Sequence, residues 1–392
     1  MISLLNQLNE FIDSKETEML ELLKNIVNMD SGSKDKREVD LLGKCLQEKW
    51  RKTGFEIEEL QYSKVGNCYI ARFNKDHPGK KVVLIGHLDT VFPKGETNLR
   101  PFKIEGNMAF GPGVGDMKGG LVTMLYAVKA LKCQGYLTGP LSVILNSHEE
   151  IGSTYIRDSL VNESKDARIV FNLEPARPDG AVVTERKGVA SLDIRIHGKA
   201  VHAGVEPKKG ANANLELAYR IIELQNLNHF REGLTVNANV VSGGFARNVI
   251  SDIAKAEVDI RFKKKEDIDL LNQHLLNSLS KPKVSGTKCH SKIKVSFLPM
   301  ERNANILSAY HVVQKAGEEL GITINEAFSG GGADSGLTAQ NGIPTICGMG
   351  PIAGNAHSDE EYLKIPTLTE RCKLLALAIA LSWKEAAISN RV

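Results

Sequence analysis

The spacing of apolar residues predicts alternating strands and helices in the first half of the chain. Three short apolar runs bounded by turn or polar residues are typical of strands buried on both faces, at residues 82–85, 141–145 and 169–173. Between the first two runs, apolar residues at 3.6-residue spacing predict a helix over 121–131, with Gly135 just beyond its end. Two more helical stripes occur in the first 50 residues, at 19–27 and 39–50. Alternation of this kind indicates an α/β layer fold.

The pattern changes near Lys187, where apolar and polar residues begin to alternate, as in strands with one solvent-exposed face. Strands are predicted at 189–196, 253–262 and 293–298, and amphipathic helices at 215–224 and 268–279. Their order resembles a ferredoxin-like domain of strand–helix–strand–strand–helix–strand type. The α/β pattern then returns and ends in an apolar helix over about 368–383. We therefore predict a catalytic domain in two parts, 1–186 and 297–392, separated by an inserted domain at 187–296.

Charge and composition exclude several classes of partner. The chain has 392 residues, with 50 basic and 47 acidic side chains, and this balance gives no reason to expect nucleic acid or a membrane surface. The longest apolar stretch, residues 374–383, is too short to span a bilayer, and no signal peptide is visible. Six scattered cysteines without a Cys-x-x-Cys pair suit reduced thiols. We expect a cytoplasmic protein.

Candidate metal ligands follow the predicted strands or lie in glycine-rich turns. They are His87 with Asp89, Asp116 in the glycine-dense segment 111–120, the pair Glu149 and Glu150, Glu174, and His357. The carboxyl ends of strands are where α/β sheets place their active sites, so we expect these side chains to converge. Imidazole and carboxylate donors without a thiol suit zinc, with cobalt or manganese as alternatives. One shared carboxylate would serve two ions about 3.5–4 Å apart.

Each motif also has an ordinary reading when it is taken alone. The His87-x-Asp89 pair could be polar loop residues, Asp116 could cap a helix, and the two glutamates could form a solvated surface pair. Glu174 and His357 could each lie in a plain surface loop. Adjacent carboxylates repel unless a cation or proton offsets them, so one could bind metal while its neighbour acts as general base. Segment 111–120 lacks the Gly-Lys-Ser/Thr ending of a phosphate loop, so nucleotide binding is not supported.

As a set, these motifs resemble the co-catalytic zinc amidohydrolases and exopeptidases. That family includes glutamate carboxypeptidase of the carboxypeptidase G type, acetylornithine deacetylase, succinyl-diaminopimelate desuccinylase and the aminoacylases. The resemblance covers essentially the whole chain, and the Leu-Glu-Pro context of Glu174 is most similar to the glutamate carboxypeptidase branch. It implies a zinc-exopeptidase-like three-layer α/β catalytic domain with an inserted α+β ferredoxin-like lid and dimerisation domain.

The resemblance also implies a role for each residue and two Zn²⁺ ions. It makes His87 and Glu174 ligands of one ion, Glu150 and His357 ligands of the other, Asp116 the bridge before a cis peptide, Asp89 the partner that orients His87, and Glu149 the general base. For substrate binding it points to His202 at the scissile carbonyl, Asn248, Arg261 at the terminal carboxylate, the glycine loop around Gly332, and Arg302 as a second carboxylate clamp. A surface histidine, a turn asparagine and the solvent face of a strand remain alternatives for His202, Asn248 and Arg261.

The resulting prediction is a dinuclear zinc hydrolase that cleaves an amide bond next to a free carboxylate. The leaving group would be a C-terminal, glutamate-like amino acid of a peptide or N-acyl amino acid. A biosynthetic deacylase of the acetylornithine or succinyl-diaminopimelate type and a non-catalytic metal-binding relative remain open as alternatives. The predicted partner is a small molecule or short peptide, and the resemblance implies a homodimer through the inserted domain.

Overall fold

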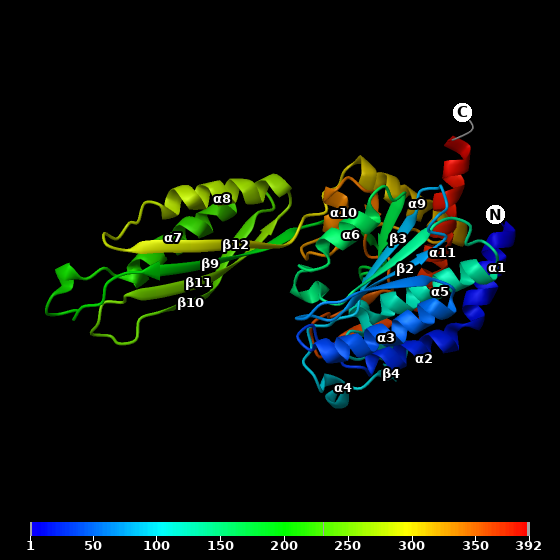
Figure 1. The fold of residues 1–392 in the computed structure, drawn as a ribbon, viewed down its shortest axis with the longest axis horizontal. Coiled ribbons are helices and arrows are strands. Elements are labelled where there is room, and N and C mark those ends of the chain that lie inside the picture. The colour runs from blue at the N-terminus through cyan, green and yellow to red at the C-terminus, as the bar shows by residue number, and fades with distance from the viewer. Residues whose placement is uncertain (1, 230, 390–392) are drawn as a thin grey trace. The chain divides into compact units, whose positions relative to one another are not determined.

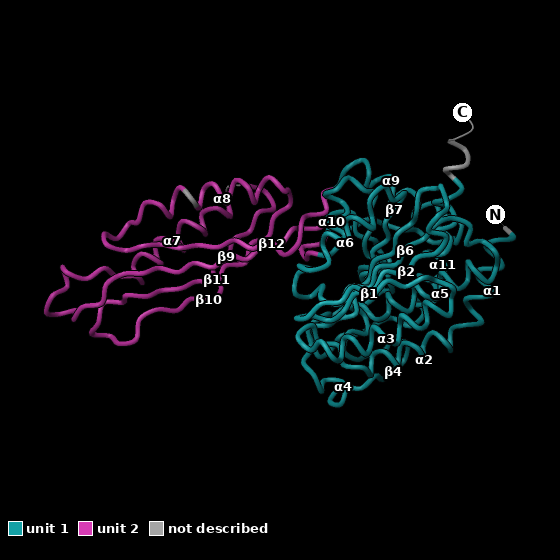
Figure 2. Tube along the Cα trace, viewed as in Figure 1, with its two compact units in different colours: residues 1–185, 302–328, 333–392 teal, residues 186–301, 329–332 magenta. Residues whose placement is uncertain are grey.

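A computed structural model describes residues 2–229 and 231–389, which pack into two compact units. The first unit (unit 1) comprises residues 1–185, 302–328 and 333–392, and the second (unit 2) residues 186–301 and 329–332; they are coloured teal and magenta in Figure 2. These two units are defined by which residues pack together. The predicted domain boundaries at residues 187 and 296 stay a prediction.

Unit 1 is built around a mixed six-stranded sheet with strand order β1-β2-β6-β3-β7-β14. Two of its strands, β2 and β3, are labelled in Figure 1. Its strands are β1 (Glu56–Leu60), β2 (Cys68–Phe73), β3 (Val82–His87), β6 (Leu141–Asn146), β7 (Ile169–Asn172) and β14 (Thr345–Ile346). β6, β3, β7 and β14 are parallel neighbours. β2 pairs antiparallel with β6, and β1 pairs antiparallel with β2. Every residue of β3, β6 and β7 is buried, which confirms the three strands expected from the apolar runs.

Helices cover both faces of this sheet because its strands are apolar on both sides. Along β3, Val82 and Leu84 pack into the main core, while Val83 and Ile85 point to the opposite face and are buried there. The helices of the unit are α1 (Ile2–Ser14), α2 (Glu16–Val27), α3 (Lys36–Lys52), α4 (Glu96–Leu99), α5 (Gly119–Cys133), α6 (Arg157–Ser164), α9 (Ala304–Leu320), α10 (Ser335–Gln340) and α11 (Pro366–Ser389). The main core includes side chains of α1, α2, α3, α5, α9 and α11, whereas α10 lies against β7 and β14 and contacts α6. The result is a three-layer α/β arrangement.

The first 50 residues hold three helices, so the prediction of two was incomplete. The missed helix is α1, whose buried residues Leu4, Leu8 and Ile12 recur only once per turn. That narrow stripe is buried because α5 and α11 pack against it, a tertiary effect that periodicity does not reveal.

Short strands beside the main sheet position two of the loops that carry candidate ligands. An antiparallel sheet of order β15-β16-β5-β4 is formed by β4 (Lys103–Glu105), β5 (Met108–Phe110), β15 (Ala353–Gly354) and β16 (Tyr362–Lys364). Phe110 at the end of β5 pairs with Tyr362 at the start of β16. The segment after Phe110 therefore lies beside the segment before Tyr362. A further two-stranded sheet joins β8 (Val182–Arg186) to β13 (Glu326–Ser329).

Unit 2 has the expected order of two strand–helix–strand repeats. It contains β9 (Gly188–His197), α7 (Ala213–Asn226), β10 (Thr235–Gly243), β11 (Ile253–Phe262), α8 (Lys265–Leu279) and β12 (Lys288–Phe297). The sheet order β10-β11-β9-β12 is antiparallel throughout, and alternate residues of β9 and β11 enter a core shared with α7 and α8. β12 begins at Lys288 and not at residue 293, because its polar first half lies on a sheet edge and carries little apolar signal. The predicted fold class is confirmed.

Candidate metal centre

The candidate ligands of unit 1 gather at the edge of the sheet where the parallel strands end. His87 is the last residue of β3, and Glu150 lies in the 3-10 turn Glu149–Ile151 that follows β6. Glu174 lies two residues after the end of β7. Because neighbouring parallel strands end at the same edge, these three side chains come from adjacent positions.

Asp116 and His357 join this edge from loops that the small sheet places side by side. Asp116 lies in the turn Val114–Lys118, which precedes α5 and contains the cis peptide bond Asp116–Met117 that the resemblance had implied. The turn has non-helical dihedral angles at Asp116, and the residue preceding α5 is Lys118, so Asp116 is not the helix cap. His357 has a positive φ of 65° in the loop before β16.

The five predicted ligands form two trios that share Asp116. His87, Asp116 and Glu174 offer donor atoms within 4.8 Å of one another, and so do Asp116, Glu150 and His357. Asp116 Oδ1 lies 3.0 Å from His87 Nε2, while its Oδ2 lies 3.4 Å from His357 Nε2. His87 Nε2 is 3.8 Å from Glu174 Oε1, and His357 Nε2 is 3.2 Å from Glu150 Oε2. One carboxylate therefore presents one oxygen to each trio, as a bridging ligand does.

Several ionisable side chains lie close together in this site and shift one another's pKa. Burial, followed by the negative charge of Glu174, raises the pKa of Glu149 well above its usual range. Burial also raises the pKa of Glu150. Hydrogen bonds to Asp116 and Glu150 raise the pKa of His357 to about 10. Burial acts to raise the pKa of Asp116, but hydrogen bonds from the two histidines hold it below its usual range. The donors share protons, which divalent cations can replace.

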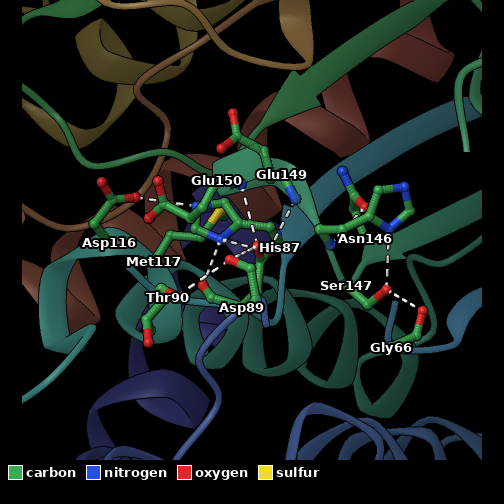
Figure 3. A network of polar contacts seen from close by, with 12 residues as sticks. Gly66, His87, Asp89, Thr90, Asp116, Met117, Asn146, Ser147, Glu149 and Glu150 are labelled. Atoms are coloured by element: carbon green, nitrogen blue, oxygen red, sulfur yellow. Dashed lines mark hydrogen bonds and ion pairs between the residues drawn. The ribbon is translucent and has the colours of Figure 1, made fainter. Parts of the chain in front are cut away.

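Asp89 makes its main contacts with the loop of the two glutamates. Its fully buried carboxylate accepts the backbone N–H groups of Glu149 at 3.0 Å and Glu150 at 3.1 Å (Figure 3). It also accepts the Ser33 hydroxyl at 2.6 Å. His87 Nδ1 lies 2.9 Å from the backbone oxygen of Asp89 and 3.5 Å from its carboxylate. Asp89 thus contacts His87 and also holds the segment that carries Glu149.

A metal ion fits these residues on the chemistry of the donors. Each trio combines imidazole nitrogen with carboxylate oxygen, the donor types that suit zinc and similar divalent ions. Glu150 Oε1 is buried and has no hydrogen-bond partner, although buried carboxylate oxygens are normally paired. An ion in the second trio would supply the missing partner.

Glu361 and Asp334 are two further candidate functional residues that the sequence did not predict. Glu361, 1% exposed, accepts the backbone N–H groups of Gly113, Gly115 and Asp116, each at 2.9 Å. Asp334, in the predicted glycine loop, accepts hydrogen bonds from Asn146 and Ser153, on either side of the Glu149 turn. Burial raises the pKa of Asp334. Both residues act through contacts distant in the sequence. The only local signal for Glu361 was its place in the acidic run after His357.

The predicted substrate-binding residues are divided between the units. In unit 2, His202 pairs with Val249, and the backbone of Asn248 accepts the N–H of Ala203, so the His202 and Asn248 segments lie side by side. Both side chains are exposed. The Gly332 oxygen accepts a hydrogen bond from Arg186. These placements leave the predicted substrate roles as predictions.

Both predicted carboxylate clamps are paired with acidic side chains of their own unit. Arg261, on β11, forms an ion pair with Asp259 at 2.9 Å. Arg302, in unit 1, forms one with Glu326 at 2.8 Å and is 45% exposed. A substrate carboxylate would have to compete with these partners, and the two roles stay predictions.

Comparison with known proteins finds similarity to metallopeptidases and to related hydrolases. Residues 83–381 match the model of peptidase family M20/M25/M40. Carboxypeptidase G2 of Pseudomonas sp. (strain RS-16) is 29% identical over 383 residues, covering 95% of this chain and 91% of that protein. Succinyl-diaminopimelate desuccinylase of Alkalilimnicola ehrlichii is 24% identical over 341 residues, covering 82% of this chain and 88% of that protein.

Solved structures share the fold. A tripeptidase from Staphylococcus aureus superposes with a TM-score of 0.80 at 23% identity, covering 94% of this chain and 99% of that one. The Bacillus subtilis YXEP protein, described as a dinuclear metal binding peptidase, superposes with a TM-score of 0.68 at 18% identity, covering 94% and 98%. Among the described residues, no helix is both long and apolar enough to cross a membrane.

Proposed function

Because the chain belongs to peptidase family M20/M25/M40, and is therefore a metal-dependent hydrolase, we propose that it is a dinuclear zinc carboxypeptidase or amidohydrolase. The bond cleaved is an amide next to a free carboxylate, and the leaving amino acid is glutamate-like. The observation that carries this proposal is the sharing of Asp116 between two donor trios. The similarity to carboxypeptidase G2 over 95% of the chain supports the choice of substrate class.

In this proposal the chain's own residues hold the ions and move one proton. His87, Asp116 and Glu174 hold one ion, and Asp116, Glu150 and His357 the other. When bound, two such ions lower the pKa of a water toward about 7 and polarise the scissile carbonyl. Glu149 accepts the water's proton and passes it to the leaving amine. Burial raises the pKa of Glu149, and the positive charge of bound ions would favour the carboxylate form that accepts a proton.

Unit 2 supplies most of the substrate contacts in this proposal, and Arg302 of unit 1 supplies one more. His202 donates to the oxyanion, a contribution whose loss typically costs about 10²–10³ in rate. Asn248 and the backbone at Gly332 contact the bound ligand. Arg261 takes the terminal carboxylate through a charge-assisted contact, and Arg302 is the second clamp.

Replacement of Glu149 by glutamine tests whether Glu149 is the general base. The side chain is nearly isosteric and belongs to neither trio, so E149Q should keep its metal content and lose about 10²–10⁴ in kcat. Metal analysis and a peptidyl- or N-acyl-glutamate assay on the same preparation give both readouts. Near-normal turnover by metal-loaded E149Q would refute the assigned role.

A biosynthetic deacylase is the second candidate, favoured by the desuccinylase relative. A panel of N-acetylornithine, N-succinyl-diaminopimelate, N-acyl amino acids and dipeptides separates the two, run with zinc, cobalt and manganese. The first proposal requires the highest kcat/KM on a substrate that releases glutamate or a similar acidic amino acid. No turnover on the whole panel would favour a non-catalytic metal-binding protein.

We also propose a homodimer through unit 2. β10 is at the edge of its sheet and lies beside α7, whose Leu215, Tyr219 and Ile222 form an exposed apolar stripe at helical spacing. Light scattering coupled to size exclusion should give twice the chain mass, and I222K should shift it toward the monomer. The six free cysteines fit the cytoplasmic location that we propose.

A further inference from the structure

Glu361 lies between two ligand-bearing loops because of the way the small sheet pairs. It immediately precedes β16 and comes four residues after His357. The pairing of Tyr362 with Phe110 places it opposite Gly111, where the glycine-dense segment begins. Its side chain is almost completely buried there.

The side-chain oxygens of Glu361 accept three hydrogen bonds from the backbone of the Asp116 turn. Oε1 accepts the N–H groups of Gly115 and Asp116, and Oε2 accepts that of Gly113. These three backbone donors satisfy both oxygens of a buried carboxyl group, which would otherwise lack partners. Since both oxygens are occupied in this way, and Glu361 belongs to neither donor trio, its carboxylate is placed to hold the turn.

The glycines of the turn allow this close wrapping around a carboxylate. A Cβ at Gly115 would lie 2.4 Å from the Cβ of Ala353 and 3.5 Å from Glu361 Oε1. Gly113 has a φ of 73°, which side chains disfavour. A side chain at Gly115 would clash with Ala353, and one at Gly113 would meet Thr90 at 2.5 Å, so glycine at both positions lets the turn keep this path beside Glu361.

We propose that Glu361 is a positioning residue that holds the Asp116 turn so that one Asp116 oxygen faces each trio. It also ties that turn to the loop that carries His357, so the shared ligand and one unshared ligand move together. This inference rests on the proposed metal function. It adds a residue that touches neither metal nor substrate and yet sets the affinity for both ions.

The test compares E361Q with E360Q in the holoenzyme and the metal-free protein. Glu360 is exposed and adjacent, so E360Q makes the same chemical change on the same loop without touching the turn. In E361Q the amide NH2 must face at least one backbone N–H, so the turn loses a contact. Competition with a chromophoric chelator should show zinc affinity reduced about 10- to 100-fold in E361Q and unchanged in E360Q, because partners beyond the ligands typically have effects of this size.

A second variant separates position from charge and covers poor folding of the first. E361D keeps the charge but is one methylene shorter, so positioning predicts about tenfold weaker zinc binding, whereas a purely electrostatic role predicts wild-type affinity. At saturating zinc, kcat should fall while KM stays within about twofold, and circular dichroism should show the metal-free variants folded. Wild-type zinc affinity in either Glu361 variant overturns the inference. Failure of the wild-type protein to bind zinc would instead refute the proposed function.

Discussion

Replacement of Asp89 by asparagine tests how the loop of the two glutamates is held. The carboxylate accepts one backbone N–H on each oxygen, from Glu149 on Oδ1 and from Glu150 on Oδ2, with the Ser33 hydroxyl also on Oδ2. An amide has only one oxygen. Whichever way it turns, its NH2 faces one of the two backbone N–H groups. The serine hydroxyl can rotate, but a backbone N–H cannot.

The loss of local stability in D89N can be estimated from these hydrogen bonds. A buried donor left unsatisfied costs about 1–3 kcal/mol. The surviving hydrogen bonds lose the charge that roughly doubles their strength, so the local total is about 2–4 kcal/mol. Amide exchange in a peptide spanning 147–152 should then accelerate by roughly 30- to 800-fold in D89N, because exchange reports local opening.

Ser33→Ala is the matched control for D89N. It removes the third donor and leaves both backbone contacts, so exchange in the same peptide should rise less than about fivefold. Hydrogen-exchange mass spectrometry on the metal-free proteins makes both measurements. Exchange of D89N within threefold of wild type, or equal effects of D89N and S33A, would refute this reasoning.

Three other predictions follow from the structure. D116N should weaken both zinc ions, while E174Q should weaken only one, and metal content after dialysis distinguishes them; equal patterns would contradict the sharing of Asp116. Burial acts to raise the pKa of Glu163, but hydrogen bonds from Arg72 and Ser142 hold that pKa below its usual 4.5. The ionised Glu163 side chain therefore stabilises the fold above pH 4.5, and this contribution is lost as the pH falls through the folded-state pKa. E163Q should therefore cost about 3 kcal/mol at pH 7, and less at pH 3.5, in urea unfolding; a loss independent of pH would be contrary to this. Leu8→Ala should cost about 2–5 kcal/mol without changing zinc affinity, and a changed affinity would show that α1 acts on the site.

Strands whose burial gives a simple pattern of apolar residues could be predicted from the sequence alone. Continuous apolar runs predicted β3, β6 and β7 because strands buried on both faces need no polar positions. Strict alternation predicted β9 and β11 for the opposite reason. β1 was missed because its Glu-Ile-Glu-Glu-Leu sequence lies at a sheet edge, where polar residues are tolerated.

The candidate site was predictable only as far as its chemistry is local. His87, Glu150 and Glu174 follow strands, so their convergence could be expected from strand order. The contact between Glu361 and Gly113 joins residues almost 250 positions apart and depends on the pairing of β5 with β16, which no single segment reveals. The family resemblance assigned Asp89 to His87, whereas the shortest contacts of its carboxylate are to Glu149, Glu150 and Ser33.

The most direct test of the account is the number of zinc ions that one chain binds at these residues. Metal-free wild-type protein is dialysed to equilibrium against buffered zinc, and bound metal is measured by mass spectrometry. The account predicts two ions per chain, since two donor trios meet at Asp116. Binding of no zinc, or of a single ion at saturation, would contradict it.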